Sequence, residues 1–234
     1  MPYDLEIKLL NLTRNRERVP LNELAEQLHV HPNSLMDQIA ALHENALVDT
    51  VNDFIELDVT KRMLLAHHLI RNGHDPEKVS RSFKWQEFED FAANLLIENG
   101  YRIFKHLVFK SKAGRREIDL MAWNDSFILA IDCKHWSRRL SPSRVRTAAS
   151  AQTERTKLLA DRPEVLVKHG LNVTEMRRIL SVIVTLAEPQ QRIIDGVPVV
   201  PIIKLPSFLY GVSPLDETFR MIPIRAHFRQ STLV

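Results

Sequence analysis

Residues 117–134 decide the fold, and they read EIDLMAWNDSFILAIDCK. Two apolar runs flank a short polar break of Asn, Asp and Ser, which are residues that favour turns. Apolar runs of this length, rich in residues that prefer extended backbone and separated by a turn, are typical of a β-hairpin. Residues 117–123 and 127–134 are therefore predicted to form neighbouring antiparallel strands joined by a loop of two to four residues.

The alternation of side chains along these strands predicts which polar groups lie together. Residues two apart on a strand share a face, so Asp132 and Lys134 form one same-face pair and Glu117 and Asp119 another. With a loop of two or four residues, Asp119 lies opposite Ala130 or Asp132, and directly opposed side chains share a face. The two aspartates then converge, whereas a loop of three residues separates them.

Two converging carboxylates beside a lysine suit chemistry on a phosphate. Mg²⁺ and Mn²⁺ prefer oxygen ligands and bind through one or two carboxylates together with phosphate oxygens of the substrate. Asp119 and Asp132 fit that role. The ammonium group of Lys134 is suited to stabilise charge on the phosphate or to orient the attacking water. The pattern favours a metal-dependent nuclease.

The order of these motifs resembles the PD-(D/E)xK nuclease superfamily, and within it the branch of Mrr-type restriction endonucleases and archaeal Holliday-junction resolvases. Phe88-Glu89 resembles the first motif, Ile118-Asp119-Leu120 the second and Asp132-Cys133-Lys134-His135-Trp136 the third. Gln152 resembles an extra glutamine that this branch has on the following helix. The resemblance covers about residues 84 to 205 and leaves out the beginning of the chain.

The resemblance implies an α/β (α+β) restriction-endonuclease-like fold, in which a mixed sheet is flanked by helices. It implies a metal-dependent DNA endonuclease that hydrolyses phosphodiester bonds in repair, recombination or restriction, with Mg²⁺ or Mn²⁺ as cofactor. The expected catalytic residues are Glu89, Asp119, Asp132, Lys134 and Gln152. Three carboxylates are expected to hold the metal, namely Asp119, Asp132 and Glu89.

Further elements of this domain follow from apolar spacing and from residues that begin or end helices. A helix is expected from Trp85 to Gly100, and a strand over residues 102–110. Ser141 followed by Pro142 is a good helix start, and this helix is predicted to run to about Ala160. Residues 179–186 and 199–203 are apolar and predicted to extend the sheet, the second at an edge or a bulge because it contains a proline.

The beginning of the chain has a different composition. Residues 1–60 carry 4 Lys and Arg against 11 Asp and Glu, a net charge of −7, whereas residues 61–234 carry 28 against 18, a net charge of +10. Three stretches with helical spacing followed by a hairpin resemble a winged helix-turn-helix. We therefore predict a winged-helix-like domain over 1–59, a helical connector over 60–83 and a nuclease-like domain over 84–234.

The charge distribution predicts the partners. Basic residues concentrate after the third motif and are expected to bind DNA, with a solvated helix face as the alternative for each one; they are Arg138, Arg139, Arg144, Arg146, Arg155 and Lys157. Between Val19 and Thr60 there is neither lysine nor arginine, so a protein contact or dimerisation is favoured there over tight DNA binding by this part alone, and a role in orienting DNA held by the second domain is left open. The sequence leaves a homodimer open, because cutting two strands needs two sites or two events.

Several classes are excluded. No run of about 18 apolar residues is present and the amino terminus lacks a secretory signal, so a cytoplasmic protein without a membrane span is expected. A glycine-rich phosphate loop is also lacking, which argues against ATP coupling. The single cysteine, Cys133, is expected to be a packed thiol. The alternative to an enzyme is a non-catalytic nucleic-acid-binding regulator, or an adaptor on a nuclease-like scaffold.

Overall fold

The computed structural model describes residues 5–75, 78–79, 81–126, 128–134, 141–173, 178–186 and 188–225. These residues fall into two compact units, and the chain passes from the first to the second between Phe91 and Ala92, inside one helix. The predicted division at residues 59 and 83 stays a prediction. Within the predicted helical connector, residues 76, 77 and 80 lie outside the described residues.

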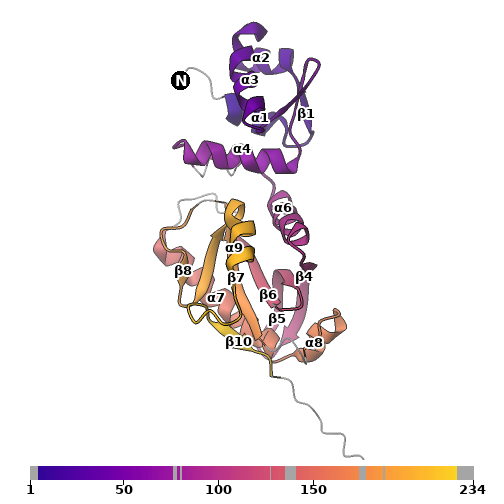
Figure 1. The fold of residues 1–234 in the computed structure, drawn as a ribbon, viewed down its shortest axis with the longest axis vertical. Coiled ribbons are helices and arrows are strands. Elements are labelled where there is room, and N and C mark those ends of the chain that lie inside the picture. The colour runs from indigo at the N-terminus through magenta and orange to yellow at the C-terminus, as the bar shows by residue number, and fades with distance from the viewer. Residues whose placement is uncertain are drawn as a thin grey trace, which may run out of the picture. The chain divides into compact units, whose positions relative to one another are not determined.

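The first unit combines helices with a small sheet (Figure 1). Its elements are α1 (Leu5–Leu12), β1 (Arg18–Pro20), α2 (Leu21–Leu28), the 3₁₀ helix η1 (Pro32–Leu35), α3 (Met36–Glu44), β2 (Asp49–Val51), β3 (Phe54–Glu56) and α4 (Val59–Arg71). The three strands are antiparallel in the order β1-β3-β2. Strand β1 was not expected from the sequence, and the winged-helix assignment stays a prediction.

A buried arginine ties the elements of the first unit together. Arg62 on α4 is 2% exposed, and its guanidinium donates hydrogen bonds to the carbonyl oxygens of Leu10 and Ser82, each at 2.7 Å. It also donates to the hydroxyl of Thr13 and pairs with the carboxylate of Glu87. A buried charge is tolerated when its hydrogen-bonding groups are all engaged in this way. Arg62 therefore links α1, α4 and the segment before α6.

The second unit is built on a seven-stranded mixed sheet (Figure 1). After α6 (Trp85–Glu98), which contains the boundary between the units, the elements are β4 (Arg102–Ser111), β5 (Gly114–Trp123), β6 (Ile128–Lys134), α7 (Pro142–Ala160), α8 (Pro163–Lys168), β7 (Arg178–Thr185), β8 (Ile193–Ile194), β9 (Val197–Pro201), η2 (Ile202–Lys204), α9 (Leu205–Gly211) and β10 (Met221–Pro223). The order is β4-β5-β6-β7-β9-β8, and β10 pairs with β7.

The sheet changes from antiparallel to parallel at β6, which pairs antiparallel with β5 and parallel with β7. All residues of β6 except the last are buried. A strand that is covered on both faces reads as a nearly continuous apolar run, which is why residues 128–131 lack alternation. Helix α7 packs along one face, and α9 lies in front of the other in Figure 1. This arrangement presents the carboxyl end of β6 to α7.

The predicted elements of the second unit agree closely with those observed. Ser141 caps α7, since its hydroxyl accepts a hydrogen bond from the backbone N–H of Arg144 at 3.3 Å, and Pro142 follows as the first helical residue. The prediction for residues 199–203 was wrong at its end, because Ile202–Lys204 form the 3₁₀ helix η2. None of the helices in the described part of the chain is long and apolar enough to cross a membrane.

Candidate active site

The hairpin of β5 and β6 brings two aspartates to adjacent strand positions. The two strands pair from Trp123↔Ile128 to Leu120↔Ile131, so four residues separate the paired ends. Continued by one residue, this register sets Asp119 opposite Asp132. Of the loop lengths considered, the structure has the four-residue one, which makes the two aspartates converge.

Asp119 lies where the pairing of β5 with β6 ends, and its carboxylate reaches across to the neighbouring strand. Its Oδ2 atom accepts a hydrogen bond of 2.8 Å from the backbone N–H of Cys133, the residue after Asp132. The Cys133 side chain is fully buried, in agreement with a packed thiol. The Asp119 carboxylate is therefore held beside the end of β6.

Asp132 is a buried carboxylate that faces two cations. It is 1% exposed, and its Oδ1 atom accepts hydrogen bonds from Lys134 Nζ at 3.0 Å and from Arg155 Nη2 at 2.6 Å. Lys134 Nζ also lies 2.8 Å from Oδ2, but not in hydrogen-bonding geometry, so within the described chain Oδ2 is a buried oxygen that accepts no hydrogen bond. Both cations are partly exposed, with 26% of the Lys134 side chain and 24% of the Arg155 side chain accessible.

Gln152 lies under this cluster. It is fully buried on α7, where its Nε2 donates to the carbonyl oxygen of Ala130 at 2.8 Å and its Oε1 accepts from Arg155 Nε at 3.0 Å. We expected Gln152 to approach DNA or the attacking water, but both ends of its amide are engaged within the protein. Gln152 thus connects the backbone of β6 to the arginine that binds Asp132, which indicates a supporting position.

Glu89 belongs to the first unit, on the part of α6 before the boundary. It is 3% exposed, and its Oε1 accepts a hydrogen bond from the indole N–H of Trp85. That bond compensates part of the cost of placing a carboxylate on an apolar helix face. In the described ranges, no group of three or more His, Cys, Asp or Glu side chains is placed to hold a metal ion. The role of Glu89 as a third metal ligand stays a prediction.

The residues at the end of β6 fit a hard divalent cation. Two carboxylates, one of which has a buried oxygen without a hydrogen bond, supply the kind of ligand that Mg²⁺ and Mn²⁺ prefer. Two protein carboxylates are enough when phosphate oxygens and water complete the shell. Asp119 and Asp132 are balanced by Lys134 and Arg155, so these four side chains carry no net formal charge. A cation therefore has to compete with Arg155 and Lys134 for Asp132.

The basic residues expected to bind DNA divide into three groups. Arg138 and Arg139 lie outside the described residues. Arg144, Arg146 and Lys157 are exposed on α7, where Lys157 Nζ lies 3.7 Å from the carboxylate of Glu154. Arg155 alone of the described residues in the set contacts the carboxylate cluster.

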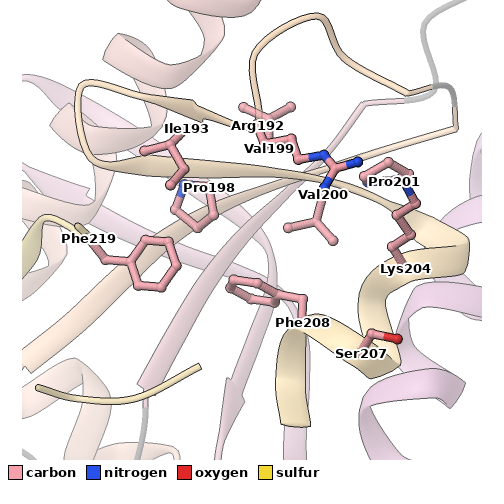
Figure 2. A pocket seen from close by; sticks show the side chains of 10 residues that line it. All are labelled: Arg192, Ile193, Pro198, Val199, Val200, Pro201, Lys204, Ser207, Phe208 and Phe219. Carbon is pink, nitrogen blue, oxygen red and sulfur yellow. The ribbon is translucent and has the colours of Figure 1, made fainter. Parts of the chain in front are cut away.

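An apolar cleft of about 410 Å³ lies elsewhere in the second unit, at β9 and α9 (Figure 2). Phe208 and Phe219 line it, with ring centroids 5.9 Å apart and an edge-to-face arrangement. Arg192 and Lys204 also border it, and both pair with Glu188, at 2.9 and 2.7 Å. No carboxylate is among its lining residues, so this cleft does not supply the predicted chemistry.

Glu188 illustrates the balance of charge at the edge of that cleft. Burial raises the pKa of its carboxyl, but the hydrogen bonds and positive charges of Lys204 and Arg192 outweigh this effect and hold the pKa below its usual range. The carboxylate is consequently ionised under ordinary conditions, and it neutralises part of the positive charge of its two partners.

Comparison with known proteins supports a nuclease-like domain. Residues 80–160 match the family Mrr_cat, described as a restriction endonuclease. No curated protein sequence matches the chain. A protein of unknown function, AF1548, is similar in structure, with 17% identity over 52% of this chain and 60% of that chain and a TM-score of 0.32. The protein VC1899 from Vibrio cholerae has 12% identity over 88% of this chain and 49% of that chain, with a TM-score of 0.33.

These findings confirm two expectations. The resemblance to Mrr-type restriction endonucleases is confirmed over residues 80–160, and the predicted fold class is confirmed by the mixed sheet with flanking helices. The chain spans 60% and 49% of the lengths of the two similar structures. The family match supports a nuclease-like function, whereas the metal, the substrate and the site residues are proposals.

Proposed function

We propose that this protein is a metal-dependent DNA endonuclease and that the end of β6 is its active site. The observation that carries the proposal is the buried carboxylate of Asp132, which faces Lys134 and Arg155 beside the carboxylate of Asp119. A protein that only binds DNA has no physical need for converging carboxylates near a phosphate, because they offset cations that could otherwise contact the phosphate.

Asp119 and Asp132 would hold Mg²⁺ or Mn²⁺, and Glu89 is the proposed third carboxylate. A bound divalent cation polarises the phosphorus–oxygen bond and lowers the pKa of a coordinated water. Lys134 donates hydrogen bonds from its ammonium group to a non-bridging phosphate oxygen and stabilises the charge that develops there. Gln152 acts indirectly, because its hydrogen bond positions the guanidinium of Arg155.

Arg155 has two roles in this scheme. In the structure its guanidinium binds Asp132 Oδ1, and its side chain is 24% exposed. An arginine at such a position can move from the carboxylate to a phosphate, since its planar group recognises both. The remaining basic residues contribute affinity through the release of counter-ions from the DNA backbone.

A second candidate function rests on the same cluster. The burial of the Asp132 carboxylate is already compensated by two protein cations. A non-catalytic regulator or adaptor on a nuclease-like scaffold would have this property. It would bind nucleic acid and leave it intact, with the acidic residues 1–60 as the candidate surface for a protein partner.

Incubation with labelled DNA separates the two functions. Linear duplex, single-stranded and four-way-junction DNA are each incubated with Mg²⁺, with Mn²⁺ and with chelator. The wild-type chain is compared with Asp132→Asn, which keeps the shape of the side chain, and with Asp125→Ala, which removes an exposed carboxylate from the hairpin turn. We expect metal-dependent cleavage by the wild type and by Asp125→Ala only. Binding without cleavage under every condition would favour the regulator.

A further inference from the structure

Strands β4 and β5 lose their regular pairing at one level, where His106 and Asp119 face each other. The register passes from Lys105↔Leu120 directly to Leu107↔Ile118, and it is the same on both sides of the gap. His106 has a φ of 53°, a left-handed backbone conformation in the middle of a strand. Such a conformation is uncommon for residues other than glycine and often marks a functional position.

The side chains show that both strands shift by one residue at this level. Ile118 and Met121 belong to the same buried cluster on the α7 side of the sheet, although residues three apart on a regular strand point to opposite faces. The same holds on β4, where Leu107 belongs to this cluster and Phe104 packs against it. The irregularity is thus matched on the two strands, which explains why the register is preserved.

The shift decides where the carboxylate of Asp119 lies. Counted from Met121, Asp119 would point to the α7 face, and counted from Ile118 it would point to the other. Its Oδ2 instead accepts the hydrogen bond from the N–H of Cys133, which directs the carboxylate sideways to β6. The irregular level of the strand pair is therefore also the level at which Asp119 approaches Asp132.

We propose that His106 is a positioning residue for Asp119, and that its left-handed backbone is the property that matters. The inference rests on the proposed function in one respect, because that function makes Asp119 a ligand of the metal. With an extended backbone at His106, β4 would return to regular alternation and the matched shift on β5 would lose its partner. Asp119 would then point to one face of the sheet and away from Cys133.

The imidazole ring of His106 makes a contact that contributes little to stability. His106 Nδ1 lies 3.1 Å from Glu117 Oε1, with 52% and 47% of the two side chains exposed. Exposed pairs of this kind contribute little to stability. The conformation of His106, which is built into the sheet, is therefore a better candidate for the functional property than its ring.

Three substitutions separate the backbone from the ring. Glycine and asparagine at position 106 remove the imidazole but accept a positive φ, whereas valine does not because its branched side chain clashes in that conformation. The first readout is the amide signal of Cys133 in a ¹H–¹⁵N NMR spectrum together with its hydrogen-exchange rate, which needs no enzymatic activity. The second readout is metal-dependent DNA cleavage. Glu117→Gln tests the contact of the ring.

We expect His106→Gly, His106→Asn and Glu117→Gln to keep the Cys133 signal, its slow exchange and the rate of cleavage. His106→Val is expected to shift that signal, to speed its exchange and to lower cleavage about a hundredfold, since a displacement of about 1 Å has effects of that order. Thermal unfolding shows whether His106→Val is folded. If it is not, His106→Ala takes its place, and we expect the same changes in the Cys133 signal, its exchange and the cleavage rate, but smaller ones.

Two results would overturn the inference. One is a valine variant with the wild-type Cys133 signal and rate, and the other is a glycine variant that loses as much as valine, since the ring would then be the functional group. The proposed function fails separately, if the wild type does not cleave DNA with any metal. In that case the Cys133 signal in the four variants still decides whether His106 positions Asp119.

Discussion

Each of the two units contains a buried charge, and the two charges are compensated in different ways. Arg62 in the first unit is 2% exposed and is held by the backbone carbonyl groups of Leu10 and Ser82, by the hydroxyl of Thr13 and by the carboxylate of Glu87. Asp132 in the second unit is 1% exposed and is held by Lys134 and Arg155, whose side chains are partly exposed. Carbonyl groups cannot leave Arg62 without unfolding, whereas exposed side chains can exchange Asp132 for other partners. We infer that the first charge is structural and the second functional.

The largest effect is expected when the functional charge cluster loses its lysine. Lys134→Met keeps the length of the side chain but removes the ammonium group, so cleavage should fall by about 10²- to 10³-fold, as for the loss of one preorganised donor. The free energy of unfolding should change little, because Arg155 still pairs with Asp132. Rates on labelled DNA and thermal unfolding test this. Lys168→Met, an exposed lysine on α8, is the matched control, and an equal loss of activity in both would contradict the assignment.

For Arg62, the structural charge, we expect a large effect on the free energy of unfolding, which Lys134→Met should change little. Arg62→Met leaves two carbonyl groups without their donor and Glu87 without its cation, and we expect the free energy of unfolding to drop by about 3 kcal/mol, as when a buried ion pair loses one partner. Urea denaturation measures the change. Arg71→Met removes an exposed arginine from the same helix and should have almost no effect. A loss for Arg62→Met as small as that of the control would break the comparison between the units.

At Arg155 we expect a smaller effect, which is a gain in metal affinity and not a loss. Arg155→Met removes a cation that competes for Asp132, so the affinity for Mn²⁺ should rise several-fold, in line with an electrostatic contribution of about 1 kcal/mol for a partly exposed pair. Cleavage should nevertheless fall, because the guanidinium no longer reaches the phosphate. Isothermal titration calorimetry without DNA measures the affinity. Arg178→Met, an exposed arginine at the start of β7, is the control, and weaker binding by the Arg155 variant alone would show that Arg155 assists the metal.

The smallest effect concerns Glu188 beside the apolar cleft. Its pKa is lowered in the folded protein, so its ionised form stabilises the fold above the ordinary carboxyl pKa of about 4.3, and this contribution disappears as the pH falls through the lowered value. Because the group is largely exposed, the contribution should stay below about 1 kcal/mol and weaken in salt. Glu188→Gln should lower the unfolding midpoint slightly at pH 7 and not at pH 3. An equal shift at both pH values would rule out the ionic explanation.

Much of the fold could be predicted because its signals are local. The turn residues after Trp123 and the serine cap before Pro142 act on neighbouring backbone, and the elements they predict begin and end close to the observed positions. Strand β1 was missed, since three residues give no periodicity and only pairing with Phe54–Glu56 makes Arg18–Pro20 a strand. The apolar run of residues 202–203 was misassigned as strand for the related reason that the sequence does not mark where pairing stops.

The residues of the candidate site could be proposed from the sequence, but their contacts could not. Asp119, Asp132 and Lys134 follow from the spacing of the hairpin, and the structure brings them together. The burial of Gln152 did not follow, because a glutamine on a polar helix reads as exposed until α7 is packed against the carbonyl group of Ala130. The pairing of Asp119 with Glu117 on one face was assumed from regular alternation. The irregular pairing at His106 breaks that alternation. Apart from the histidine itself, no residue pattern near this position predicts it.

The sequence by itself determined the hairpin, the serine cap of α7 and the residues proposed to form a metal site, whereas β1, α8, β8 and β10 did not follow from it. Only the tertiary structure decided that Arg155 binds Asp132, that Gln152 supports it and that Asp119 turns to β6. The physical reason is the distance along the chain over which the interactions act. Turns, caps and apolar runs depend on interactions within a few residues, whereas burial, ion pairs and the phase of a sheet depend on contacts between segments far apart in the chain.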